Sequence, residues 1–256
     1  MTTRRLHSLP DLPTELVDGR YEVLGSLGSG AQGAVLRVRD RSTGDELVLK
    51  AVVVAESAIA ARAVIAEFGH LARVEDPGLP RVRDLAVAET GPLAKGTVYF
   101  TAERVEGVPV IDAVAAAGER ERARLIWSVA RDVAGALAAL HAAGLLHHDV
   151  TPGNVLVCGG GAAARAVLID LGLAAPARAV IDARGTPAYL APEALAGGAE
   201  PRSDLYALGA TLHHAASGAA PFGGDDLGAT LRAILERPAR PPTRSAHRAA
   251  WRAGAR

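Results

Sequence analysis

The sequence predicts an α+β chain with two parts, an antiparallel β-sheet over residues 21–104 and a mainly helical part over residues 105–237. Two observations carry this prediction. Short segments rich in Val, Leu and Ile, separated by turn residues, fill the first part and are typical of a strand meander. Apolar residues recur at helical spacing through much of the second part. The change in character falls between residues 102 and 109.

The first part should contain five strands and one helix. Strand, tight turn, strand, turn and strand is the order of an antiparallel meander. Apolar residues at intervals of three to five positions predict a helix over residues 56–74, which Pro77 and Pro80 end. The strands are expected at residues 21–27, 34–38, 46–54, 82–88 and 98–102.

The second part should be built around one long amphipathic helix over residues 119–143, with Gly144 as its C-terminal stop. Later helices are expected at residues 203–216 and 226–236, and short apolar segments at 154–157 and 167–169. Residues 1–20 are predicted to be an irregular lead-in. Residues 238–256, rich in Arg and Pro and without an acid, are predicted to be a solvated tail.

Composition argues against several classes of protein. Lys and Arg number 28, as do Asp and Glu, so the chain lacks the basic excess of a nucleic-acid or membrane-surface binder. The single cysteine, Cys158, excludes a disulfide framework and a cysteine-based zinc site. Charged residues interrupt the longest apolar stretch, and no apolar run follows the first arginines as in a signal peptide. We therefore expect a cytoplasmic protein with no nucleic-acid partner and no membrane span.

A glycine-rich segment, GSGAQGAV over residues 28–35, is the first candidate binding motif. Gly28, Gly30 and Gly33 would let backbone N–H groups approach phosphate oxygens closely. A flexible hairpin turn is the alternative interpretation. The glycines join two predicted strands, and Val35 belongs to the second strand, whereas a dinucleotide site places a helix after its glycines. That order matches the glycine-rich loop that covers ATP phosphates.

Lys50 is the second candidate. The chain has only two lysines, Lys50 and Lys95, and Lys50 lies inside an apolar strand. Burying an ammonium group is costly unless the group is paired. Glu67, on the predicted helix that follows, could hold the ammonium against nucleotide phosphates. The alternatives are an outward-pointing lysine on an edge strand and an ordinary exposed helix glutamate.

The third candidate is HHDVTPGN over residues 147–154, followed by an apolar segment and Asp170. Asp149 can orient a hydroxyl group and accept its proton. Asn154 and Asp170 offer the hard oxygen ligands that Mg²⁺ prefers. The two histidines could instead suggest a transition-metal site, although no third ligand stands at suitable spacing.

With these motifs the chain resembles the eukaryotic-like serine/threonine protein kinases of bacteria, over about residues 21–222. GTPAYLAPE over residues 185–193 is similar to the substrate-binding turn of that family, and SDLYALG over 203–209 to the start of its large buried helix. The resemblance implies a two-lobed protein kinase-like fold, with a small antiparallel sheet lobe and a larger, mainly helical lobe. It also implies ATP, Mg²⁺ and a protein substrate with a Ser or Thr acceptor.

The resemblance implies a role for each matching residue. Asp149 would be the catalytic base, with Thr151 two residues later, and Lys50 and Glu67 would form an ion pair. Asn154 and Asp170 would hold Mg²⁺. Further residues would hold the nucleotide, among them the hinge after residue 102: Leu27, Gly28, Gly30, Gly33, Val35, Val48, Lys50, Glu103, Val105 and Leu156.

The chain departs from the family pattern at two catalytic positions. His148 stands where the family has an arginine that binds a phosphorylated activation loop, and residues 171–184 contain no Ser, Thr or Tyr. We therefore expect activity that does not depend on activation-loop phosphorylation. Thr151 stands where the family has a lysine that neutralises the transferring phosphoryl group. We expect a slow kinase, with a pseudokinase that binds ATP or acts as a scaffold as the alternative.

A third departure lies after Phe222, where the family continues through several more helices. The helical lobe is therefore expected to be shortened. Glu193 would lack the arginine that it normally pairs with, and a partner would cover apolar surface on this lobe.

Overall fold

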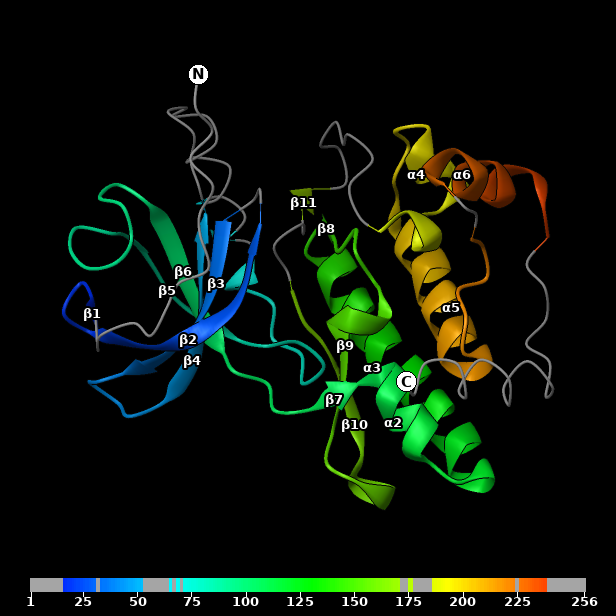
Figure 1. Cartoon of the computed structure of the whole chain (residues 1–256), viewed down its shortest axis with the longest axis horizontal. Coiled ribbons are helices and arrows are strands. Elements are labelled where there is room, and N and C mark those ends of the chain that lie inside the picture. Colours follow the sequence, from blue (N-terminus) through cyan, green and yellow to red (C-terminus); the bar gives the residue numbers. More distant parts are fainter. Residues whose placement is uncertain are drawn as a thin grey trace. The chain divides into compact units, whose positions relative to one another are not determined.

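The computed structural model describes residues 16–30, 33–52, 65, 68–69, 71–170, 175–176, 186–223 and 226–238. The chain divides into two units (Figure 1). The first unit takes Met1–Ala72 and Arg81–Arg104, and the second takes Arg73–Pro80 and Val105–Arg256. Residues 73–80 join the second unit because the Leu168 amide donates to the Gly78 carbonyl at 2.8 Å, and Leu79 is buried.

The first unit is built on one six-stranded antiparallel sheet, in the order β1-β2-β3-β4-β6-β5. Each predicted strand is present, with ends that differ by up to three residues. Residues 16–17 form a strand as well, so the prediction of an irregular lead-in through residue 20 was wrong there. The strands are β1 Leu16–Val17, β2 Tyr21–Gly30, β3 Gly33–Asp40, β4 Glu46–Val52, β5 Val82–Val87 and β6 Val98–Glu103.

One face of this sheet packs into the hydrophobic core of the first unit. Leu47, Leu49 and Ala51 alternate along β4 and are all buried, because successive side chains of a strand point to opposite faces. They pack with Tyr21 and Tyr99, whose rings meet edge to face at 6.1 Å. The other face of β4, which carries Val48 and Lys50, is half-buried.

The second unit is mainly helical. Its long helix α3 buries Val129, Val133, Leu137 and Leu140 and packs against α5 and β10. Two small antiparallel sheets carry the loops between helices. The helices are α2 Val110–Ala116, α3 Glu119–Ala142, α4 Pro192–Leu195, α5 Pro201–Ser217 and α6 Leu227–Glu236, and the strands are β7 Val108–Pro109, β8 Leu145–Leu146, β9 Val155–Cys158, β10 Arg165–Leu168 and β11 Ala175–Pro176.

Local sequence signals explain where these helices begin and end. Glu200 and Ser203 form a reciprocal capping box at the start of α5, and Gly218, with φ of 82°, ends that helix in the left-handed region. The Asp226 side chain accepts from the Ala229 amide at 2.7 Å and caps α6. Among the described helices, α3 alone has the length and apolar composition of a membrane span, a test that core helices also pass.

Candidate active site

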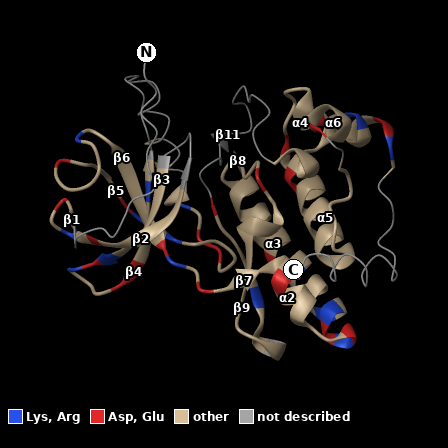
Figure 2. Ribbon diagram, in the orientation of Figure 1, with Lys and Arg blue, Asp and Glu red and all other residues tan. Residues whose placement is uncertain are grey.

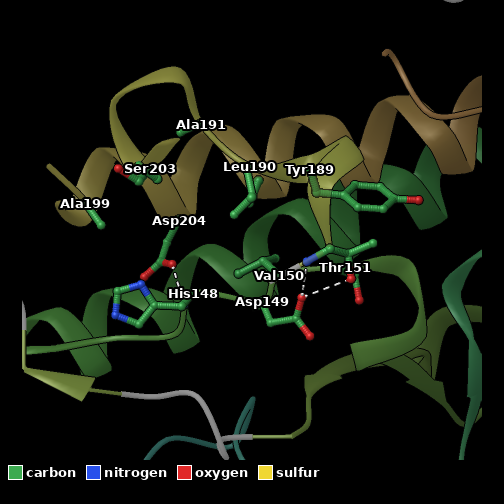
Figure 3. Close-up of a pocket in the computed structure, with 13 residues that line it drawn as sticks. His148, Asp149, Val150, Thr151, Tyr189, Leu190, Ala191, Ala199, Ser203 and Asp204 are labelled. Carbon is green, nitrogen blue, oxygen red and sulfur yellow. Dashed lines mark hydrogen bonds between the residues drawn. The ribbon is translucent and has the colours of Figure 1, made fainter. Parts of the chain in front are cut away.

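A buried carboxylate near the start of α5 organises the loop that follows β8. Asp204 Oδ2 accepts from the His147 amide at 2.8 Å and from His141 Nε2 at 2.8 Å, while Oδ1 accepts from the His148 amide at 2.9 Å (Figure 3). Burial by itself would raise the pKa of Asp204, but these hydrogen bonds outweigh it and hold the pKa below its ordinary value. Asp204 is therefore an ionised anchor for two consecutive amides.

His147 is fully buried and links this loop to the end of β10. Its Nδ1 accepts from the Asp149 amide at 3.3 Å, and its Nε2 lies 3.2 Å from the Ile169 carbonyl oxygen. An acceptor at Nδ1 and a donor at Nε2 are the pattern of a neutral imidazole. Burial agrees with that state, because it lowers the pKa of His147. His147 is thus a neutral strut between Asp149 and the residue before Asp170.

The backbone turns sharply at two positions around this strut. His148 has φ of 67° and Asp170 has φ of 62°, both in the left-handed region. Such a conformation costs a residue other than glycine about 1–3 kcal/mol and persists where the surroundings enforce it. For His148 the enforcing contact is the hydrogen bond from its amide to Asp204.

The carboxylate of Asp149 is held from two sides. Asn154 Nδ2 donates to Oδ2 at 2.9 Å and also to the Asp149 carbonyl oxygen at 2.9 Å. Thr186 donates to Oδ1 through its amide at 3.1 Å and through its hydroxyl group at 3.2 Å. Donors on both oxygens fix the orientation of the carboxylate and leave it ready to accept a proton from a further hydroxyl group.

The three-residue helix η1, Pro152–Asn154, brings Asn154 next to the end of β10. The Ile169 amide donates to the Asn154 carbonyl oxygen at 2.7 Å, so Asp170 follows directly after a residue bound to Asn154. Because the side-chain nitrogen of Asn154, Nδ2, donates to Asp149, the side-chain oxygen, Oδ1, is the atom that remains to bind a cation. One amide oxygen and one carboxylate suit Mg²⁺, which keeps waters and phosphate oxygens among its ligands.

The described residues show no group of three or more His, Cys, Asp or Glu side chains that could hold a metal ion. His147 uses both ring nitrogens in hydrogen bonds, so neither ring nitrogen of His147 is available to a metal ion. The arrangement therefore does not favour the transition-metal alternative for the histidine pair.

A small pocket of about 20 Å³ lies beside Asp149, between this loop, residues 186–191 and α5 (Figure 3). Thr151 is buried and lines it, and its carbonyl oxygen accepts from the Asn154 amide at 3.0 Å. Tyr189 also lines the pocket, and its hydroxyl group lies 2.6 Å from His214 Nδ1. Residues 186–190 are thus attached at one end to Asp149 and near the other to α5.

In the first unit, the register of the sheet places three predicted nucleotide residues on one face. Val35 lies opposite Lys50, and Lys50 opposite Phe100, so these side chains share a face with Val48, two residues before Lys50. This is the half-buried face of β4. Because β4 lies between β3 and β6, the edge-strand interpretation of Lys50 was wrong.

The glycine-rich segment belongs to two paired antiparallel strands, and residues 31–32 between them lie outside the described residues. β2 and β3 pair as far as Gly30 opposite Gly33, and Gly28 lies opposite Val35. The register shifts between Ser26 and Gly28, next to Leu27, whose side chain is exposed. A strand therefore follows the glycines, which is the arrangement expected of a kinase glycine loop and not of a dinucleotide fold.

The remaining predicted residues belong to both units. Glu103 ends β6, and its carboxylate accepts from Arg83 at 3.3 Å. Val105 is half-buried at the start of the second unit. Leu156 is half-buried on β9, between two buried valines. Glu67 lies outside the described residues, so its pairing with Lys50 stays a prediction.

Sequence reasoning missed three contacts of the site. His141, in the last turn of α3, binds Asp204, and the only available signal was a polar residue ending an apolar helix. Thr186, in the segment expected to be the substrate-binding turn, holds Asp149. Glu193, expected to lack its arginine, accepts from the Ser203 hydroxyl group at 2.8 Å.

Comparisons with known proteins agree with this arrangement. The family model described as the protein kinase domain matches residues 21–248. The DNA damage-responsive serine/threonine-protein kinase RqkA of Deinococcus radiodurans is 34% identical over 224 residues, 85% of this chain and 32% of that protein. The serine/threonine-protein kinase PknA of Mycobacterium tuberculosis is 32% identical over 232 residues, 87% of this chain and 52% of that protein. The chain thus spans about a third to a half of the length of these relatives.

The buried state of His147 predicts a pH dependence of stability. Its pKa is lowered in the folded chain, whereas the unfolded side chain titrates near 6.5. The unfolded state therefore binds protons first, and the stability that neutral His147 contributes is present above about pH 6.5 and is lost as the pH falls below it. Urea unfolding between pH 5 and 7.5 should show a free energy of unfolding that decreases with decreasing pH. The slope should be shallower in His147→Gln, and an unchanged slope would contradict the assignment.

Proposed function

Because the chain belongs to the protein kinase domain family, we propose that it transfers the γ-phosphate of ATP to serine or threonine hydroxyl groups of a protein substrate. The observation that carries the proposal is the fixed carboxylate of Asp149, which Asn154 and Thr186 hold from two sides. The backbone amide of Asp149 donates to neutral His147, and the backbone amide of His147 donates to ionised Asp204. A phosphoryl-transfer enzyme needs such positioning more than covalent chemistry.

In the proposed reaction, the acceptor hydroxyl oxygen forms a bond to the γ-phosphorus while the bond from that phosphorus to the ADP oxygen breaks. The hydroxyl proton passes to Asp149, and ADP leaves with the electron pair of the broken bond. The hydrogen bonds of Asn154 and Thr186 keep the carboxylate oriented toward the acceptor. His147 is neutral and fully engaged in hydrogen bonds, so it supports Asp149 without taking the proton.

We assign Mg²⁺ to Asn154 and Asp170, where it would neutralise charge on the transferring phosphoryl group. Lys50, with Glu67 as its expected partner, would bind nucleotide phosphates, and Val35 and Val48 on the same face of the sheet would contact adenine. The glycine hairpin would cover the phosphates through its backbone. The remaining proposed nucleotide contacts are Leu27, Glu103, Val105 and Leu156.

The wider setting follows from this reaction. The partner is a protein that presents a Ser or Thr hydroxyl group, and we place the reaction in the cytoplasm, where ATP is made. A further partner that covers apolar surface on the helical unit stays a prediction.

A phosphate-transfer assay with radiolabelled ATP and a general protein acceptor tests the proposal. Asp149→Asn should lower the turnover rate by at least about 100-fold, because general-base catalysis typically contributes 10²–10⁴-fold. Lys50→Met should also lower it strongly. Asp112→Asn, an exposed acid on α2, is the matched control and should leave the rate unchanged. Equal transfer by all four proteins would favour the pseudokinase alternative.

Thr151 predicts a slow enzyme, because it supplies no positive charge beside Asp149. Removal of one preorganised electrostatic contact typically costs about 10²–10³-fold in rate. The turnover rate of the wild-type chain should therefore lie below the common kinase range of about 1–100 s⁻¹. Thr151→Lys should raise it about tenfold or more, measured beside a thermal unfolding curve because Thr151 is buried. Wild-type turnover within that range would contradict this explanation.

We also propose that activity needs no phosphate on the segment between Asp170 and Gly185. That segment contains no Ser, Thr or Tyr, and His148 replaces the arginine that would bind such a phosphate. The backbone amide of His148 donates instead to Asp204. Treatment with a broad-specificity phosphatase, followed by removal of the phosphatase, should leave the turnover rate unchanged. A fall in rate that autophosphorylation restores would contradict the proposal.

A further inference from the structure

A second groove, of about 700 Å³, lies in the second unit away from Asp149. It runs between α2, the first half of α3 and the turn that joins β9 to β10. Its floor is apolar and includes Val108, Ala113, Leu125 and Val157. A concave, largely apolar floor with a few polar groups at its margin is typical of binding sites.

Two arginines line this groove without a partner. Arg120 and Arg124 are exposed, and in the described part of the chain neither makes an ion pair or a hydrogen bond. Their neighbours differ, because Arg122 donates to the carbonyl oxygens of Val114 and Ala117, and Arg131 pairs with Asp132 at 2.8 Å. Figure 2 shows basic and acidic residues side by side at the start of α3.

Trp127 lies on the same face of α3 as Arg124, outside the lining of the groove. It follows Arg124 by three residues and precedes Arg131 by four, so the three side chains share one face of α3. The indole is 77% exposed, although a tryptophan is normally largely buried. Exposed tryptophan next to arginine is the composition of interaction hot spots.

We propose that this groove binds an extended acidic segment of a partner protein, with apolar side chains on the floor and carboxylates at Arg120 and Arg124. Residues 239–256 of this chain are a poor match, because they carry five arginines and no acid. The apolar floor and the acid Glu121 on the lining favour a peptide over a nucleic-acid backbone. The proposal does not depend on phosphate transfer.

Gly160 provides a way to block the groove without straining the fold. It lines the groove in an extended conformation, with φ of −150°, and a Cβ added there would meet no atom within 4 Å. Gly160→Glu should therefore place a carboxylate at the groove and repel an acidic ligand. Arg232→Glu on α6 is the matched control, because Arg232 is an exposed helical arginine outside the groove.

Fluorescence anisotropy with a fluorescein-labelled nine-residue peptide of alternating Glu and Leu tests the proposal. A peptide with Lys at every Glu position and a single-stranded oligonucleotide of matched charge are compared with it. The acidic peptide should bind saturably and at least tenfold more tightly than either. Arg120→Glu/Arg124→Glu and Gly160→Glu should each weaken it at least tenfold, while Arg232→Glu should change it less than twofold.

Several outcomes would overturn the proposal. These are no saturable binding of the acidic peptide, equal binding of the lysine peptide, tighter binding of the oligonucleotide, or an equal loss in Arg232→Glu. Phosphate transfer to a general acceptor should persist in Gly160→Glu, and this readout separates failure of the groove from failure of the kinase proposal. Thermal unfolding of each variant checks that the second unit is folded.

Discussion

The ionised carboxylate of Asp204 is the contact on which the candidate active site depends. It lies in the first turns of α5 and accepts hydrogen bonds from two consecutive amides and from a histidine of α3. An unpaired buried carboxylate would be costly, and these three donors offset that cost. In return, the carboxylate holds His148 in a left-handed conformation that turns the chain into Asp149. One buried charge thus joins two helices and the loop between β8 and β9.

A second chain of contacts passes from this anchor to Asp149, the proposed base. His147 hydrogen-bonds to the Asp149 amide and to the carbonyl oxygen before Asp170, and Asn154 and Thr186 orient the Asp149 carboxylate. Asp149, the proposed base, therefore sits among neutral hydrogen-bond donors from Asn154 and Thr186.

Helix α3 has different roles at its two ends. Its buried residues hold the core of the second unit, and its last turn supplies His141 to Asp204. Its first turns expose Arg120 and Arg124, which line the apolar groove, and Trp127. The same helix therefore supports the proposed catalytic loop at one end and lines the proposed peptide groove at the other. The exposed side chains named here thus lie in the first half of α3, and the contact with Asp204 lies in its last turn.

The sequence by itself determined the element order and the candidate residues. Local patterns predicted the strands of the first unit, the glycine hairpin and helices α3, α5 and α6, because periodicity and turn chemistry are properties of neighbouring residues. Motif spacing identified Asp149, Asn154 and Lys50. Only the tertiary structure decided the hydrogen-bond partners of Asp204 and Asp149, the central place of β4 and the attachment of residues 73–80 to the second unit. Those contacts join residues such as His147 and Asp204, 57 positions apart, and no local pattern specifies which distant groups a buried charge will meet.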